Sequence, residues 1–217
     1  AYNNEMNNPI KEKDREKLKR TAEWDKTFLK SDKVNHSKVT FTNRYGITLA
    51  ADMYVPKNTD GKLPAIAVCG PFGAVKEQAA GLYAQTMAER GFLTIAFDPS
   101  YTGESGGTPR YTVSPDINTE DFSAAVDFLA TNDRVDAERI GIIGICGWGG
   151  LAINAAAADP RIKATVASTM SDMSRVNANG YFAAEARHGE TKPPRRRRAD
   201  NDTADCRNGH RNPGGGL

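Results

Sequence analysis

The chain has 217 residues, of which 39% are hydrophobic and 26% are charged, with 29 Lys and Arg against 27 Asp and Glu. This composition predicts one soluble globular domain. A formal charge of +2 is too small to indicate a nucleic-acid partner, and no apolar run approaches the roughly 20 residues that span a bilayer. We therefore expect no nucleic-acid partner and no membrane partner.

Three cysteines, Cys69, Cys146 and Cys206, form neither a disulfide framework nor a pair at metal-ligand spacing. No metal and no cofactor are implied by these residues or by the three histidines. The chain starts at Ala1 and has no apolar targeting segment, so a cytoplasmic protein and a periplasmic or secreted protein after processing are equally compatible with it.

Composition divides the chain into three segments. Residues 1–37 carry charges of both signs, which predicts an exposed helical or irregular arm that packs through Trp24 and Phe28. Residues 38–182 alternate short β-branched runs with helix-length amphipathic segments, as an α/β domain does. Residues 183–217 are rich in Arg, Gly and Pro, and we expect this tail to be disordered.

The ordered part begins with an antiparallel hairpin of strands at 38–42 and 47–55, which turns at Gly46. The other expected elements are a strand at 65–69, a helix at 76–90, a strand at 92–97, a helix capped by Thr119, a strand at 140–145, a helix at 151–158 and a strand at 162–167. This order predicts an α/β fold with a mostly parallel sheet and an N-terminal antiparallel hairpin. The sheet is incomplete at its C-terminal edge, since no further strand is recognisable.

Polar residues follow two of the predicted strands. Lys76, Glu77 and Gln78 suit the first turn of a solvated helix, although they could also face the mouth of a site. Asp98 and Ser105 are expected to organise their loop by local hydrogen bonds rather than to act in catalysis.

One strand end has the pattern of a nucleophile elbow. The strand at 140–145 runs through Gly144-Ile-Cys146-Gly147-Trp-Gly149-Gly150 directly into a helix. Glycines allow the strand and the helix to approach closely, and the helix N-terminus stabilises a thiolate. The alternative is an inert cysteine in a glycine-rich turn, whereas a dinucleotide fingerprint requires other glycine spacings.

In combination, three motifs resemble the α/β-hydrolase superfamily, and in particular bacterial dienelactone-hydrolase-like and esterase-like members with Cys or Ser at the elbow. They are the elbow itself, the run from Ile95-Ala-Phe-Asp98 to Gly103-Glu-Ser105-Gly-Gly, and Gly70-Pro-Phe-Gly-Ala-Val-Lys-Glu-Gln78. The resemblance covers about residues 38–182, and Trp148 stands where the commonest G-x-S-x-G pattern has Gly.

The resemblance implies a hydrolase of small ester, lactone or thioester substrates that works through a Cys146 acyl-enzyme. It also implies an oxyanion hole made by the backbone N–H of Gly147 and by a second N–H, that of Phe72 or Gly73. Two fixed N–H donors would stabilise the negative charge of a tetrahedral acyl intermediate.

A nucleophile of this kind needs a base, usually His, held by a carboxylate. In the family the acid and then the His follow the nucleophile, which makes Asp172 and His188 the candidates, although Asp172 equally suits a turn or cap. His36 precedes the first strand and is expected at the surface. The predicted triad is therefore Cys146, Asp172 and His188.

The alternative is that the chain departs from its family near residue 183 and is a catalytically silent α/β-hydrolase fragment or binding module without a working base. A sheet that stops at the strand 162–167 would also expose an apolar edge. We therefore expect self-association through that edge, besides a small-molecule substrate.

Overall fold

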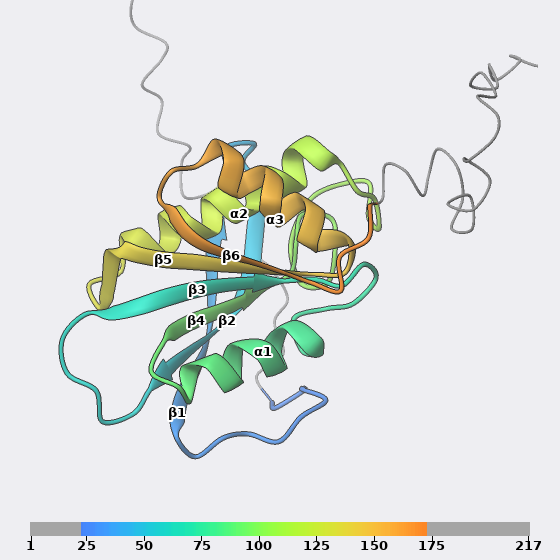
Figure 1. Ribbon diagram of the computed structural model, residues 1–217. Helices are drawn as coiled ribbons and strands as arrows, with labels where there is room; N and C mark the ends of the chain where they lie inside the picture. The colour runs from blue at the N-terminus through green and yellow to red at the C-terminus, as the bar shows by residue number, and fades with distance from the viewer. Residues whose placement is uncertain (1–22, 173–217) are drawn as a thin grey trace, which may run out of the picture. The chain divides into compact units, whose positions relative to one another are not determined.

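The computed structural model describes residues 23–172 (Figure 1). The predicted tail at 183–217 and the candidate base His188 lie outside the described residues.

Six strands form one sheet in the order β1-β2-β4-β3-β5-β6. They are β1 (Val34–Thr42), β2 (Thr48–Pro56), β3 (Leu63–Cys69), β4 (Leu93–Phe97), β5 (Val135–Ile145) and β6 (Ile162–Ser168). The hairpin β1–β2 joins β4 antiparallel, and β4, β3, β5 and β6 are parallel to one another. The predicted fold class is confirmed. The sequence also suggests that both hairpin strands are edge strands, but β2 lies inside the sheet, between β1 and β4.

Helices cover both faces of the sheet (Figure 1). α1 (Ala79–Ala88) packs on one face, and α2 (Pro115–Ala130) and α3 (Gly147–Ala158) pack on the other. β3 shows why its sequence is continuously apolar: Ala67 and Cys69 belong to the core beneath α2 and α3, whereas Ile66 and Val68 belong to the core beneath α1.

The helices begin at other residues than predicted. α1 begins at Ala79 and not at residue 76. α2 begins at Pro115, well before Thr119, because Pro suits the first turn of a helix and Asn118 Oδ1 accepts a hydrogen bond from Ser114 N at 2.9 Å. α3 begins at Gly147, directly after the elbow cysteine, and not at residue 151.

The described part of the N-terminal arm lies against α1. Trp24 and Phe28 pack on the core of that face, as predicted. Thr27 N donates to Glu77 O at 3.0 Å, and Ser31 N donates to Gln85 Oε1 at 3.1 Å. The segment therefore contacts both the helix and the loop that precedes it.

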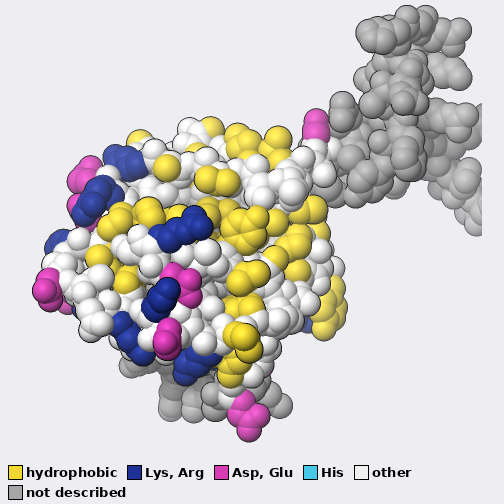
Figure 2. Space-filling model, turned by 60° about the horizontal axis from the view of Figure 1, so that its bottom comes forward, with side chains coloured by type: hydrophobic (Ala, Val, Ile, Leu, Met, Phe, Trp, Pro, Cys, Tyr) yellow, Lys and Arg dark blue, Asp and Glu magenta, His cyan; other side chains and the backbone are white. Residues whose placement is uncertain are grey.

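β6 is the last strand in the described part of the sheet. Val166 on this strand is 51% exposed, and Leu82 and Tyr83 of α1 are also exposed. Figure 2 shows hydrophobic side chains gathered along one side of the molecule. Self-association through this edge stays a prediction.

Within residues 23–172, the helices are all too short or too polar to cross a bilayer.

Candidate active site

Cys146 occupies the junction between β5 and α3 in a strained backbone conformation. Its φ is 58° and its ψ is −125°, a region that residues other than glycine rarely adopt. The backbone N–H of Cys146 donates to Ser168 O at 2.8 Å, which fixes the junction to the end of β6. This is the backbone expected of a nucleophile elbow, with a half-buried side chain at its tip.

The glycines around Cys146 differ in the room that they have. A Cβ on Gly144 would lie 2.3 Å from Trp148 O, and one on Gly149 would lie 3.0 Å from Met170 Cβ. A Cβ on Gly150 would meet nothing within 4 Å. Gly144 is thus required for the close approach of strand and helix, Gly149 has a tight neighbour, and Gly150 has no steric role.

The residues predicted for the oxyanion hole lie close together. Gly147 is the first residue of α3, where backbone N–H groups have no acceptor within the helix. Phe72 packs on it so closely that a Cβ on Gly147 would lie 1.9 Å from the Phe72 ring. Phe72 and Gly73 form the middle of a turn that Ala74 N closes by donating to Pro71 O at 3.2 Å. The phenyl ring of Phe72 also contacts the indole of Trp148, with 5.3 Å between the ring centroids.

The predicted acid and base are only partly described. Asp172 is exposed and lies four residues beyond Ser168, the residue that accepts the Cys146 N–H. His188 lies outside the described residues, so the triad stays a prediction. The surface prediction for His36 is wrong: it is half-buried on β1, separated from β5 by three strands, and its Nε2 lies 2.8 Å from Asp52 Oδ1.

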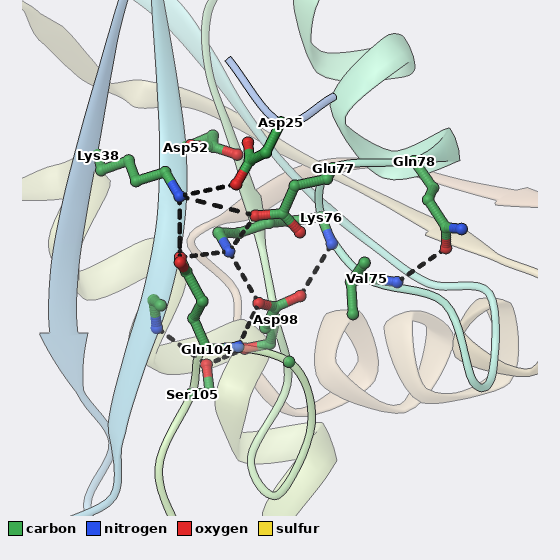
Figure 3. A network of polar contacts seen from close by, with 12 residues as sticks. Asp25, Lys38, Asp52, Val75, Lys76, Glu77, Gln78, Asp98, Glu104 and Ser105 are labelled. Carbon is green, nitrogen blue, oxygen red and sulfur yellow. Dashed lines mark hydrogen bonds and ion pairs between the residues drawn. The ribbon is translucent and has the colours of Figure 1, made fainter. Parts of the chain in front are cut away.

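Near the loop that follows β3 lies a group of charged side chains around the buried ammonium of Lys76, which we call the lysine cluster (Figure 3). Its members are Lys26, Lys38 and Lys76 with the carboxylates of Asp25, Asp52, Glu77, Asp98 and Glu104. Lys76 is at its centre, and its ammonium lies 2.9 Å from Asp98 Oδ2 and 2.8 Å from Glu104 Oε2.

The prediction that Lys76 lies in the solvated first turn of a helix is wrong. This residue is 1% exposed and precedes α1. Burial by itself would lower the pKa of Lys76, but the carboxylates of Asp98, Glu104 and Glu77 outweigh it and raise that pKa. The lysine is therefore an ammonium ion, and each neighbouring carboxylate compensates part of its charge.

Asp98 and Ser105 organise their loop as predicted. Ser105 Oγ donates to Asp98 O at 2.6 Å and accepts from Ala50 N at 2.8 Å. The Asp98 carboxylate accepts from Glu104 N at 2.9 Å, and a Cβ on Gly103 would lie 2.2 Å from it. The sequence did not reveal that the same carboxylate also accepts hydrogen bonds from Lys76.

Asp25, Glu77 and Glu104 place one oxygen each within 4.8 Å of the others, as the ligands of a metal ion would. Two ammonium groups already contact these oxygens: Lys38 bonds Asp25 and Glu104, and Lys76 bonds Glu104 and Glu77. The arrangement is therefore an ion-pair network.

Comparisons with known proteins show the family to which the chain belongs. The family model described as X-Pro dipeptidyl-peptidase (S15 family) matches residues 45–210. The chain is 71% identical over 165 residues to the uncharacterized protein PA2218 of Pseudomonas aeruginosa. The matched region covers 76% of this chain and 44% of that relative. It is 33% identical over 133 residues to the thiohydrolase aneE of Aspergillus aculeatus, which covers 61% of this chain and 41% of the relative.

Solved structures with the same fold include two that are compared with this chain below. The crystal structure of PA2218 superimposes with a TM-score of 0.76 at 69% identity and covers 78% of this chain and 53% of that one. A putative dienelactone hydrolase from Klebsiella pneumoniae shares the fold, with a TM-score of 0.53 at 24% identity over 64% of this chain and 60% of that one. The chain spans just under half the length of the two curated relatives that it matches here.

Proposed function

Because the chain belongs to the X-Pro dipeptidyl-peptidase (S15) family, whose members share the α/β-hydrolase fold, we propose that it hydrolyses small ester, lactone or thioester substrates through a Cys146 acyl-enzyme. The observation that carries the proposal is the strained backbone of Cys146, at φ 58° and ψ −125°, between β5 and α3. Such strain persists where the surrounding structure holds it in place, and it is concentrated at functional sites.

The chemistry has two steps. The base takes the thiol proton of Cys146, and the thiolate attacks the acyl carbonyl carbon. The C=O electron pair moves onto oxygen, next to the N–H of Gly147 and that of Phe72 or Gly73. The intermediate collapses to an S-acyl cysteine and releases the alcohol or thiol, which takes a proton from the base. Water then attacks the acyl-enzyme and the base removes a proton from that water. The carboxylic acid is released as the C–S bond breaks, and the base returns the proton to the Cys146 sulfur.

Asp172 and His188 are the proposed acid and base of this reaction. Asp172 follows β6, which is the neighbour of the strand that carries the elbow. The other candidate function is that of a catalytically silent member of the family, and one observation favours it. His36 is the one histidine among residues 23–172, and it bonds Asp52 on the far side of the sheet from the elbow. Three strands separate β1, which carries His36, from β5.

Thioesters are the substrates that this nucleophile would cleave with least help. Attack by a thiolate exchanges one thioester for another, and the departing thiolate needs less assistance from an acid than an alkoxide does. The relation to the thiohydrolase aneE, at 33% identity, supports the same substrate class.

The test is a burst experiment with p-nitrophenyl acetate and with an S-acyl thioester. We expect a stoichiometric burst of product that disappears in Cys146→Ala, with at least about a thousandfold loss of turnover. Cys69→Ala is the matched control, because this second cysteine is buried at the neighbouring strand end, and it keeps the burst. Turnover that survives in Cys146→Ala contradicts the proposal, and a parent chain without any burst favours the silent alternative.

A further inference from the structure

The loop of residues 70–78 connects the predicted oxyanion donors with the lysine cluster. Its first half lies on the elbow: a Cβ on Gly70 would come within 2.5 Å of Ile145 O, and Phe72 packs on Gly147. Its second half ends in the buried Lys76 and in Glu77. One short segment therefore joins the site of the chemistry to a network of ion pairs.

Lys76 holds the second half of this loop at two points on one carboxylate. Its backbone N–H donates to Asp98 Oδ1 at 2.8 Å, and its ammonium donates to Asp98 Oδ2 at 2.9 Å (Figure 3). Asp98 is itself fixed at the end of β4, since its N–H donates to Ala50 O at 3.0 Å. The loop is thus attached to the sheet through a carboxylate that is buried at the end of β4.

The bonds within the loop are local and could not fix its place on the sheet. Ala74 N donates to Pro71 O at 3.2 Å, and Gln78 N donates to Val75 O at 3.0 Å. These bonds shape two turns. The position of the turn that carries Phe72 and Gly73 therefore depends on the packing of Phe72 on Gly147 and on what anchors the ends of the turn, which are Gly70 and Lys76.

We propose that Lys76 is a positioning residue, whose ammonium holds the oxyanion-hole turn of Phe72 and Gly73 against the elbow through its bond to Asp98 Oδ2. The proposal rests on the proposed function. A lysine suits this role because its long side chain reaches three carboxylates from one buried atom, and a misplacement of the donors by a fraction of an ångström weakens stabilisation of the oxyanion.

The test compares Lys76→Met with Lys26→Met in the full chain. Both variants remove a buried ammonium of the lysine cluster, and the Lys26 side chain is 0% exposed and pairs with Asp52 at 3.0 Å. Only Lys76 belongs to the loop. We expect Lys76→Met to slow acylation of Cys146 by p-nitrophenyl acetate at least about tenfold, while Lys26→Met keeps the acylation rate of the parent.

A second reagent separates positioning from general damage. Iodoacetamide alkylates the thiol without forming an oxyanion, so its rate with Cys146 should stay the same in Lys76→Met. A parallel fall of alkylation and acylation would indicate a disturbed elbow and would overturn the proposal, as would an unchanged acylation rate.

Hydrogen exchange gives a readout that needs no activity. The Ala74 N–H closes the turn that holds Phe72 and Gly73, and it should exchange at least about tenfold faster in Lys76→Met but not in Lys26→Met. If the parent shows no burst, the proposed function fails, and unchanged exchange at Ala74 would still refute the positioning role. If Lys76→Met does not fold, Glu104→Gln removes one charged partner of Lys76 and should show the same pattern more weakly.

Discussion

A cysteine followed by a glycine stands at the end of each of the neighbouring strands β3 and β5, but the two cysteines differ in burial and in backbone conformation. Cys69 is the last residue of β3, pairs with Gly144 and is fully buried beneath α2 and α3. Burial raises the pKa of the Cys69 thiol, and the carboxylates of Asp121 and Asp98 raise it further. Cys146 follows the last residue of β5 and is half-buried.

The positive φ of Cys146 explains this difference. If β5 continued as a strand, residue 146 would point to the same face as Gly144, toward α3. The turn instead leaves its side chain against the core on the α1 face. The lesson is that a sharp turn at the last position of a strand, and not the type of residue alone, presents a side chain for chemistry.

The loops that follow the two strands are also held differently. The loop after β3 ends in the ion pairs of Lys76, whereas the elbow after β5 is held by contacts of Gly144 and Gly147 with Trp148 and Phe72. We expect the first loop to respond to charge and pH, and the second to respond to volume.

The largest expected effect is on the reactivity of the two thiols. In the native protein, iodoacetamide should modify Cys146 at least about a hundredfold faster than Cys69, because a buried neutral thiol is inert. Peptide mass mapping after timed quenching measures both rates. In denaturant the two rates should become equal, and similar rates in the native state would remove the distinction between the strand ends.

A smaller effect is expected from volume at the elbow. Gly147→Ala places a methyl group 1.9 Å from the Phe72 ring, so we expect a loss of about 1–3 kcal/mol in the free energy of unfolding and at least about a tenfold slower acylation. Gly150→Ala is the matched control in the same helix, where the methyl group meets nothing within 4 Å and Ala favours the helix by about 1 kcal/mol. Urea unfolding and burst kinetics measure both variants, and equal behaviour of the two would show that Phe72 moves aside freely.

The smallest effect concerns pH at the lysine cluster. Burial alone would raise the pKa of Asp25, but Lys26 and Lys38 lower it from 3.8 to about 2. Because the folded pKa is the lower one, the stabilisation is present above pH 3.8 and is lost as the pH falls toward 2. Asp25 is partly exposed, so we expect less than about 1 kcal/mol.

Thermal unfolding of the parent and of Asp25→Asn at several pH values measures this contribution. Parent stability should fall more steeply than that of the variant over this pH range. Parallel curves would show that these ion pairs contribute nothing to the folded state.

The sequence predicted much of the fold because strands and elbow are local patterns. The apolar run of β3 and the glycines around Cys146 can be recognised as a strand and an elbow without knowledge of distant residues. The burial of Lys76 does not, since Lys-Glu-Gln before an amphipathic run also describes a solvated first helical turn, and its partners Asp98 and Glu104 lie 22 and 28 residues away in the sequence.

The place of His36 could have been found from the hairpin. The turn at Gly46 sets the register in which His36 lies opposite Tyr54 and Lys38 lies opposite Asp52. That register brings the histidine within reach of a buried carboxylate. The start of α2 was missed because the Ser-Pro pair at 114–115 is a stronger signal than the Thr119 that follows it.

Every member of the lysine cluster precedes residue 105, whereas β5 begins only at Val135. Translation runs from the N-terminus, so the hairpin, β3 and β4 are available to one another before the elbow leaves the ribosome. The charges of the cluster can then neutralise one another while β3 still has an open side. In this order of assembly, β5 pairs with β3 after the loop that follows β3 has formed. The cysteine elbow therefore forms later than that loop.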